Sequence, residues 1–330
     1  MAVLMRQMIG VLVGLTALAT PTYAELPLQP GFSSTASPYT LSQQVAAIAS
    51  NGAGRIGIAA MNLDTGETFA FAGRDPFPMA STVKIAIAGA YLAGVDSGRF
   101  HLDQLYSRGR TVIRAGRLIE LMLIRSDNGA ADILLKAVGG TTAVNAWLAR
   151  AGIRGQRMDR TIARLVLDDR SRAGKIIANL PLTPQDMAQS ASLTEDGEVN
   201  PAFIGDARDT STPAAMVALL KKLQQGALLS PQSTVYLFDV MARCVTGAHR
   251  IKALLPPGTP VAHKTGTLAG VSDDVGIISL PNGHRLALAI FAKGMRSEWE
   301  RDRSIAEIAR LLYDRFSAMA PAPVAWGTAP

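Results

Sequence analysis

The chain has 330 residues with a formal net charge of +7, and 48% of its residues are hydrophobic while 18% are charged. This composition excludes an intrinsically disordered chain and leaves room for one large core or two domains. Arginines crowd the stretch 154–172, but aspartates interrupt them and no aromatic residues interleave with them. A nucleic-acid-binding groove is therefore not expected, and the positive charge favours anionic ligands in general.

The first 24 residues have the pattern of a secretory signal peptide. A short basic start ending at Arg6 precedes an apolar run from Met8 to Ala19, and Ala24 supplies a small residue for cleavage. The apolar run is too short for a stable transmembrane helix, although an uncleaved anchor is an alternative. We therefore expect a periplasmic or secreted protein without stable membrane insertion after cleavage, beginning with a disordered leader at 25–40.

Apolar periodicity and turn residues predict the secondary structure that follows. Helices are expected at 41–50, from Ser81 onwards, and at 118–122, 130–138, 143–151, 213–224 and 298–316, with a further capped start near Pro184. Strands are expected at 55–62 and 67–72, joined by a turn at 64–66, and at 261–264, 274–280 and 285–292. Strands at both ends enclose a helical middle, and the tail from 317 to 330 should be loose.

This order predicts an α/β (α+β) fold, in which an antiparallel sheet flanked by helices is joined to an all-helical domain. Residues 41–80 and 251–316 would form the sheet domain, and residues 81–250 the helical domain. The single cysteine, Cys244, excludes an intramolecular disulfide. The four histidines have no metal-ligand spacing and are interpreted as structural or surface residues, so we expect no metal and no cofactor; these are His101, His249, His263 and His284. We expect a monomer.

Ser81 and Lys84 are the first candidates for chemistry. They lie three positions apart at the start of an Ala- and Ile-rich helix, so both should lie on one face. In a dry environment a lysine is less readily charged, and a neutral amine can take the proton of a neighbouring serine hydroxyl. The alternative is a helix-capping serine followed by an ordinary surface lysine, and the pair alone favours that alternative.

Two further motifs reverse this balance. Ser126-Asp127-Asn128 follows an apolar run, and Lys264-Thr265-Gly266-Thr267 continues a strand. In this order, the three motifs resemble those of the serine β-lactamase and penicillin-binding protein superfamily, and the middle motif favours class A β-lactamases. The resemblance runs from about Arg55 to Phe316.

The resemblance implies an active site in a cleft between the sheet and the helical domain, and a role for each motif residue. Ser81 would be the nucleophile, Lys84 would help to deprotonate it, and Ser126 would pass a proton to the departing nitrogen, close to Lys264. Asn128 would hold the side-chain amide of the substrate. The backbone N–H groups of Ser81 and Thr267 would form the oxyanion hole.

The resemblance also implies a binding site for the substrate carboxylate. Lys264, Thr265, Gly266 and Thr267 would line it, and the substrate would be a small β-lactam or a peptide resembling the cell wall. Some class A enzymes carry an arginine where Arg250 stands, and that arginine reaches the same carboxylate. A surface arginine is the alternative.

The chain departs from the class A pattern where a glutamate normally activates water for deacylation. Read forward from Asp159-Arg160, Ile162 occupies the glutamate position, and isoleucine can transfer no proton. Read backward from the 205–210 segment, which resembles the end of the class A omega loop, Asn200 and Asp196 occupy the asparagine and glutamate positions. An insertion of about 167–194 separates the two registers. Asp196 or Glu198 could then serve as the general base, or all the acids of this loop could simply be solvated.

Three hypotheses follow. The chain is a class A β-lactamase that uses a displaced carboxylate, a related serine hydrolase that acylates but deacylates slowly or acts on another amide or ester, or a D,D-peptidase acting on cell-wall peptides. A non-catalytic binding protein is the remaining alternative, and the intact set of Ser81, Lys84, Ser126 and Lys264 argues against it. The interval from Ser81 to Ser126 is also shorter than in class A enzymes, which predicts a more open cleft.

Overall fold

The computed structural model describes residues 39–50, 54–169, 199–295 and 297–321. The predicted signal peptide, most of the leader, the capped helix start at Pro184, and Asp196 and Glu198 lie outside these residues. Among the described helices, none combines the length and the apolarity that a bilayer crossing requires.

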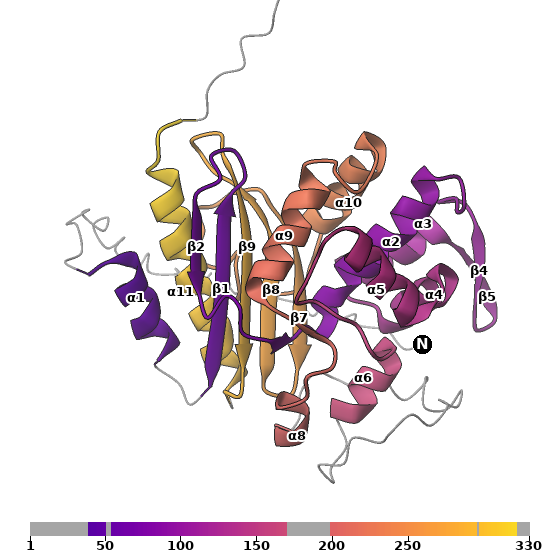
Figure 1. Cartoon of the computed structure of the whole chain (residues 1–330), viewed down its shortest axis with the longest axis horizontal. Coiled ribbons are helices and arrows are strands. Elements are labelled where there is room, and N and C mark those ends of the chain that lie inside the picture. Colours follow the sequence, from indigo (N-terminus) through magenta and orange to yellow (C-terminus); the bar gives the residue numbers. More distant parts are fainter. Residues whose placement is uncertain (1–38, 51–53, 170–198, 296, 322–330) are drawn as a thin grey trace, which may run out of the picture. The chain divides into compact units, whose positions relative to one another are not determined.

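A five-stranded antiparallel sheet is built from both ends of the chain (Figure 1). Its strands are β1 (Arg55–Asn62), β2 (Thr68–Phe71), β7 (Val261–Leu268), β8 (Val271–Ser279) and β9 (Arg285–Lys293), in the order β2-β1-β9-β8-β7. The register pairs Ile58 with Ile290, which joins the first strand to the last. The predicted turn between β1 and β2 is present: Asn62 Oδ1 accepts the N–H groups of Asp64 and Thr65.

Helices cover both faces of the sheet. Helices α1 (Leu41–Ala49) and α11 (Glu298–Ser317) pack together on one face, and α9 (Pro213–Gln224) packs on β1 and β9. Ile58 and Ile290 belong to the core beneath α1 and α11, whereas their neighbours Ala59 and Ala289 belong to the second core, which includes α9. Successive side chains of a strand point to opposite faces, so strands covered on both sides are apolar throughout.

The second core also holds the helical region. Its elements are the 3₁₀ helix η1 (Ala80–Val83), α2 (Lys84–Asp96), α3 (Ala115–Ile124), α4 (Asn128–Val138), α5 (Gly140–Arg150), α6 (Ile162–Asp169), α8 (Pro201–Ile204) and α10 (Pro231–Ala242). A hairpin of β4 (Leu105–Arg108) and β5 (Thr111–Arg114) interrupts this region, which the sequence predicted to be all helical. Short strands β3 (Phe77–Pro78) and β6 (Thr210–Ser211) pair with each other.

The predicted fold class is confirmed, and the differences are local. Thr40, assigned to the disordered leader, instead caps α1 with a reciprocal Gln43 contact. Strand β7 extends beyond the 261–264 pattern to Leu268, so the Lys264–Thr267 motif does continue a strand, and pairing with β8 runs through the whole motif. Helix α10 was not predicted, although Ser230 caps it and Pro231 occupies its first turn.

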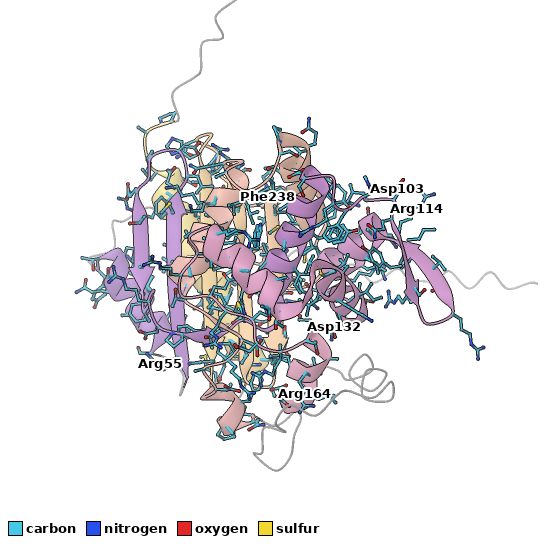
Figure 2. All side chains as sticks on the ribbon, turned by 45° about the vertical axis from the view of Figure 1, so that its right-hand side comes forward. Arg55, Asp103, Arg114, Asp132, Arg164 and Phe238 are labelled. Atoms are coloured by element: carbon cyan, nitrogen blue, oxygen red, sulfur yellow. The ribbon has the colours of Figure 1, made fainter. Side chains whose placement is uncertain are left out.

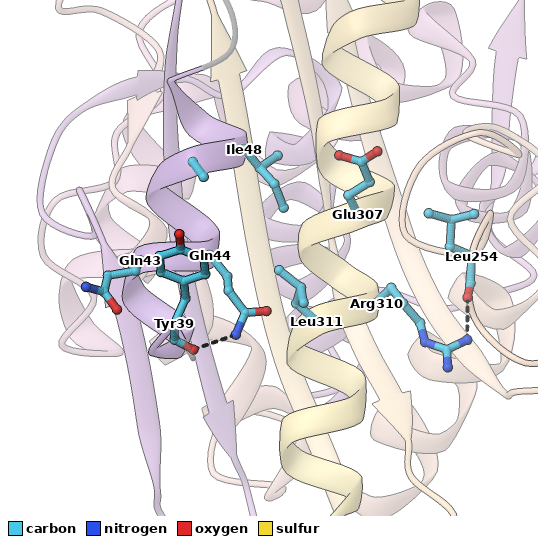
Figure 3. A pocket seen from close by; sticks show the side chains of 9 residues that line it. Tyr39, Gln43, Gln44, Ile48, Leu254, Glu307, Arg310 and Leu311 are labelled. Atoms are coloured by element: carbon cyan, nitrogen blue, oxygen red, sulfur yellow. Dashed lines mark hydrogen bonds between the residues drawn. The ribbon is translucent and has the colours of Figure 1, made fainter. Parts of the chain in front are cut away.

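A groove of about 750 Å³ lies between α1 and α11 (Figure 3). Tyr39, Ile48 and Leu311 contribute to its lining, and Arg310 closes one end with a hydrogen bond to the carbonyl of Leu254. None of the motif residues lines this groove, so the candidate site lies elsewhere.

Candidate active site

The loop before α2 places Ser81 and Lys84 on one side. Ser81 lies in η1, and a 3₁₀ helix has three residues per turn, so residues three apart lie above one another. Lys84 is fully buried at the start of α2, while Ser81 is half-buried. The preceding Ala80 is buried with φ +42°, a left-handed conformation that alanine adopts only at a cost.

Lys84 binds the second motif directly. Its Nζ donates to the Ser126 carbonyl oxygen at 2.5 Å, to Asn128 Oδ1 at 2.7 Å and to Ser126 Oγ at 3.2 Å. Asp127 holds this turn in place, because its carboxylate caps α4 through the Ala130 N–H at 2.7 Å. Ser126 itself has φ +59°, a left-handed conformation that a residue other than glycine seldom adopts.

Lys264 approaches Ser126 from β7. Its Nζ donates to Ser126 Oγ at 2.9 Å and to the carbonyl oxygen of Thr265 at 2.7 Å, and its side chain is fully buried. When both lysines are protonated, each can only donate, so Ser126 Oγ accepts from both. The Ser126 O–H is therefore directed to a third group, as proton delivery to a leaving group requires.

Gly266 lets β7 come this close to η1. A Cβ at this position would lie 2.8 Å from the Met79 carbonyl oxygen and 3.0 Å from the Ala80 Cβ, distances that a real side chain does not tolerate. Strand β7 is also an edge strand of the sheet, so alternate backbone N–H groups point away from β8. Thr267 and Ser81 thus lie on two chain segments that meet at this edge.

Thr265 and Thr267 point to the opposite side of β7 from Lys264. Thr265 Oγ1 lies 2.5 Å from Thr246 Oγ1, and Thr267 Oγ1 accepts from Arg250 Nη2 at 2.8 Å. Both threonines are buried.

Arg250 is only 3% exposed and lies behind Thr267. Its Nε donates to Asp302 at 2.7 Å, and its Nη1 donates to the carbonyl oxygens of Gly266 and Asp273 at 2.9 and 3.1 Å. Burial by itself would lower the pKa of Arg250, but the nearby carboxylates of Asp302 and Asp274 outweigh this effect and raise the Arg250 pKa. The structure therefore places this arginine so that it orients Thr267, with its other donors held by the sheet and α11.

Arg160 joins the two ends of the region that resembles an omega loop. It is buried, and it contacts Asp209 at 2.5 Å, Asp168 at 2.9 Å and Asp206 at 3.2 Å. Burial raises the pKa of Asp209 and Arg160 opposes that shift. The neighbouring arginines Arg157 and Arg164 likewise pair with aspartates of the chain.

Ile162, which the forward reading of the sequence aligned with the glutamate position, begins α6 and is buried. Its backbone N–H donates to Asp132 Oδ1 at 2.7 Å, and the N–H of Ala163 donates to Asp132 Oδ2 at 2.9 Å. Figure 2 shows Asp132 on this side of the structure, near Arg164 of α6. Burial raises the pKa of Asp132, while the two N–H groups and the nearby charge of Lys84 oppose that shift.

The carboxylates of α6 are used in structural contacts. Asp168 pairs with Arg160 and Arg164, and Asp169 Oδ2 accepts the N–H of Ala269 at 3.2 Å, just beyond β7. Asn200 Nδ2 donates to the Asp168 carbonyl oxygen at 3.3 Å. The segment that follows Asp159 and the segment that begins at Asn200, which the forward and backward readings aligned, therefore contact each other in the structure.

The structure thus brings Lys84, Ser126, Asn128 and Lys264 together by direct hydrogen bonds. Sequence reasoning missed Asp132, although it lies four residues after Asn128 and so on the same face of α4. It also missed Thr246 and Cys244, for which no local pattern exists. The described residues contain no cluster of three or more His, Cys, Asp or Glu side chains suited to a metal ion.

Comparisons with known proteins identify the family and the fold. Residues 40–316 match the model of the "Beta-lactamase enzyme family". The structure is similar to a class A β-lactamase of the last common ancestor of Gram-negative bacteria, with 32% identity and a TM-score of 0.70 over 84% of this chain and 100% of that one. It is also similar to a β-lactamase from Chitinophaga pinensis, with 28% identity and a TM-score of 0.68 over 84% of this chain and 99% of that one.

Proposed function

The chain belongs to the β-lactamase enzyme family, and we propose that it opens β-lactam rings through an acyl-enzyme on Ser81. The observation that carries this proposal is the position of Ser126 Oγ between the two buried lysines, 3.2 Å from Lys84 Nζ and 2.9 Å from Lys264 Nζ. This arrangement supplies a proton route that begins next to the nucleophile and ends at a serine hydroxyl able to protonate a leaving nitrogen.

In the proposed acylation, Ser81 Oγ attacks the lactam carbonyl carbon and gives its proton to Lys84, directly or through water. The N–H groups of Ser81 and Thr267 stabilise the oxyanion, where one donor is typically worth about 2.7–4 kcal/mol. The C–N bond breaks as Ser126 donates its proton to the ring nitrogen and takes up the proton that Lys84 received from Ser81, so that both Ser126 and Lys84 return to their starting states. Asn128 holds the side-chain amide, and Lys264, Thr265, Gly266 and Thr267 hold the carboxylate, with Arg250 acting through Thr267.

Deacylation needs a base for water, and in this proposal Asp196 or Glu198 supplies it. Both lie outside the described residues, in the segment that leads to Asn200. A second candidate, a serine hydrolase or D,D-peptidase that acylates but releases β-lactams slowly, is favoured by Ile162 at the start of α6. Isoleucine cannot activate water, and the nearby carboxylate of Asp132 is already held by two backbone N–H groups.

Intact mass spectrometry of the mature protein, from seconds to hours after adding benzylpenicillin, separates these candidates. A transient adduct with hydrolysed drug supports the β-lactamase, and Asp196→Asn and Glu198→Gln then identify the base by prolonging the adduct. An adduct that persists for hours supports slow release, and turnover of D-Ala-D-Ala peptides would identify a peptidase. A folded protein that forms no adduct, or a Ser81→Ala variant that still forms one, overturns the proposal.

We further propose that the protein acts as a monomer after export to the periplasm or the medium. The sequence pattern of residues 1–24 supports export. N-terminal sequencing of the secreted protein should begin at Glu25, and light scattering should give the mass of one chain. An uncleaved N-terminus would indicate an anchor instead.

A further inference from the structure

A short chain of side-chain contacts runs away from the site behind β7. Thr265 Oγ1 lies 2.5 Å from Thr246 Oγ1, which lies 3.2 Å from Cys244 Sγ. In each contact, either atom can be the donor. Cys244 is buried at 6% exposure and is the only cysteine in the chain.

Cys244 lies beside a buried pair of charged groups. His263 Nδ1 is 2.8 Å from Asp274 Oδ1, and both side chains are fully buried. Burial by itself raises the pKa of the Cys244 thiol, but the interactions of the thiol with His263 and with the charge of Lys264 outweigh burial and lower the pKa to about 6. Burial likewise disfavours the charged imidazole, but Asp274 raises the pKa of His263 to about 9.

The protonation state of Cys244 determines how the hydroxyls can point. A thiolate has no proton and only accepts, so the Thr246 O–H must then donate to sulfur. Thr246 Oγ1 has no second proton, and the close contact with Thr265 then requires the Thr265 O–H to donate to it. With Cys244 as a thiol the order can reverse: S–H donates to Thr246, Thr246 donates to Thr265, and the Thr265 O–H turns to another acceptor.

We propose that Cys244, acting through Thr246, decides whether Thr265 offers a proton or a lone pair to the carboxylate of a substrate. This inference rests on the proposed function, since it assigns Cys244 and Thr246 as positioning residues for the carboxylate-binding strand. A carboxylate is only an acceptor, so it gains a hydrogen bond from Thr265 in the thiol state and loses it in the thiolate state.

The direction of the pH effect follows from this. Below pH about 6, Cys244 is a thiol and Thr265 donates to the substrate; above it, the thiolate draws the hydroxyls away. The charged groups that face Cys244 are His263 and Lys264 from β7, with Asp274 of β8 behind the imidazole, and Lys252, whose Nζ donates to the Cys244 carbonyl oxygen at 3.4 Å. His263 stays protonated until pH about 9, so it does not titrate in the same range.

The test measures the second-order rate constant for acylation by benzylpenicillin from about pH 5 to about pH 8, the range around the lowered thiol pKa. In the wild type we expect this constant to fall about tenfold as pH rises, the loss expected for one hydrogen bond to a charged group. In Thr246→Val the fall disappears, because valine cannot pass the change on. In Cys244→Ser it also disappears, because a serine hydroxyl does not ionise in this range. Thr142→Val, at an exposed threonine of α5, keeps the wild-type profile.

A second readout needs no activity. Since the chain has one cysteine, the ultraviolet absorbance of its thiolate reports Cys244 alone. It should titrate near pH 6 in the wild type and Thr142→Val, and the midpoint should rise in His263→Gln. A thiol that titrates above pH about 8, or an acylation profile that falls equally in Thr246→Val, overturns this inference alone. A folded wild type that forms no adduct overturns the proposed function as well.

Discussion

Two regions that border the candidate site use charge in opposite ways. Around Ser126, two buried lysines converge on one hydroxyl and on the carbonyl oxygens beside it. Around α6, buried carboxylates and arginines neutralise one another, as Arg160 does with Asp209 and Asp168.

The two regions therefore have different roles, one in the proposed reaction and the other in holding the fold together. In the Ser126 region, charged donors lie next to the proposed reacting groups. In the α6 region, the charged side chains form ion pairs that hold one segment of the chain against another. Buried ion pairs of the second kind add little over apolar packing, but breaking one of them leaves an uncompensated charge. Variants of the two regions should therefore fail in different assays.

The largest effect is expected in the Ser126 region from Lys84→Met. Methionine keeps much of the buried volume but donates to neither Ser126 nor Asn128, and it cannot accept the Ser81 proton. We expect acylation to slow by about a thousandfold or more, as when a catalytic nucleophile loses its base. Burst kinetics with a chromogenic cephalosporin measure it, and Lys136→Met, an exposed lysine on α4, serves as the control. A loss of less than about tenfold would remove Lys84 from the proton route.

The matching change in the α6 region is Arg160→Met. It strands Asp209 and Asp168 in a buried environment, so the free energy of unfolding should fall by about 3–5 kcal/mol. Urea denaturation measures this, and Arg157→Met, an exposed arginine paired with Asp159, should cost no more than about 1 kcal/mol. Equal losses in the two variants would contradict the distinction between buried and exposed pairs.

Gly266→Ala tests the point where the sheet meets η1. The new methyl group would lie 2.8 Å from the Met79 carbonyl oxygen and from Asp273 Oδ2, so β7 must shift. We expect a loss of about 1–3 kcal/mol in stability, typical of overpacking, together with slower acylation. Gly205→Ala, where the nearest atom would be 3.5 Å away, should change neither. Normal acylation in a destabilised Gly266→Ala protein would show that the approach serves packing alone.

The smallest effect concerns pH and the Cys244–His263 pair. The lowered thiol pKa makes Cys244 stabilise the fold increasingly as pH rises from about 6 towards 9.0, whereas the raised imidazole pKa makes His263 lose its contribution as pH rises from 6.5 to about 9. The two trends oppose each other, so we expect the pair to give the wild type little pH dependence in that range. Cys244→Ser should reveal the falling trend of His263 in urea denaturation.

The double variant Cys244→Ser with His263→Gln is the control for that experiment. It lacks both titrating groups, so the trend revealed by the single variant should vanish. If the single and double variants depend on pH in the same way, His263 is not the group responsible.

The sequence was most informative where a structural requirement was local. The apolar run after Ser81 predicted a buried helix, and alternating strands around 64–66 predicted a hairpin, because both depend on neighbouring residues. The order of the three motifs predicted the meeting of Lys84, Ser126 and Lys264 only through resemblance, since the structure alone shows the hydrogen bonds.

Contacts between distant segments left no such trace. Thr246 and Cys244 follow α10 and meet β7 through the fold, and no local spacing signals their contact with Thr265 and His263. The sequence also showed no sign of the ion pair between Arg160 and Asp209, because Arg160 lies in an arginine-rich stretch and Asp209 in a distant loop. The motif was predicted to continue β7, but the need for a glycine at Gly266 was not visible in the sequence, because it arises from the close approach of Met79 and Ala80.

The pairing of β1 with β9 has a consequence for how the protein is made. Ile58 finds its partner, Ile290, only when almost the whole chain has been synthesised. Until then the β1–β2 hairpin has an open edge and no partner strand, and a two-stranded hairpin is only marginally stable by itself. Contacts so distant in sequence slow folding. The sheet can therefore be completed only after β9 has been synthesised. A chain truncated before β9 should lack a stable sheet and should not form a smaller functional protein.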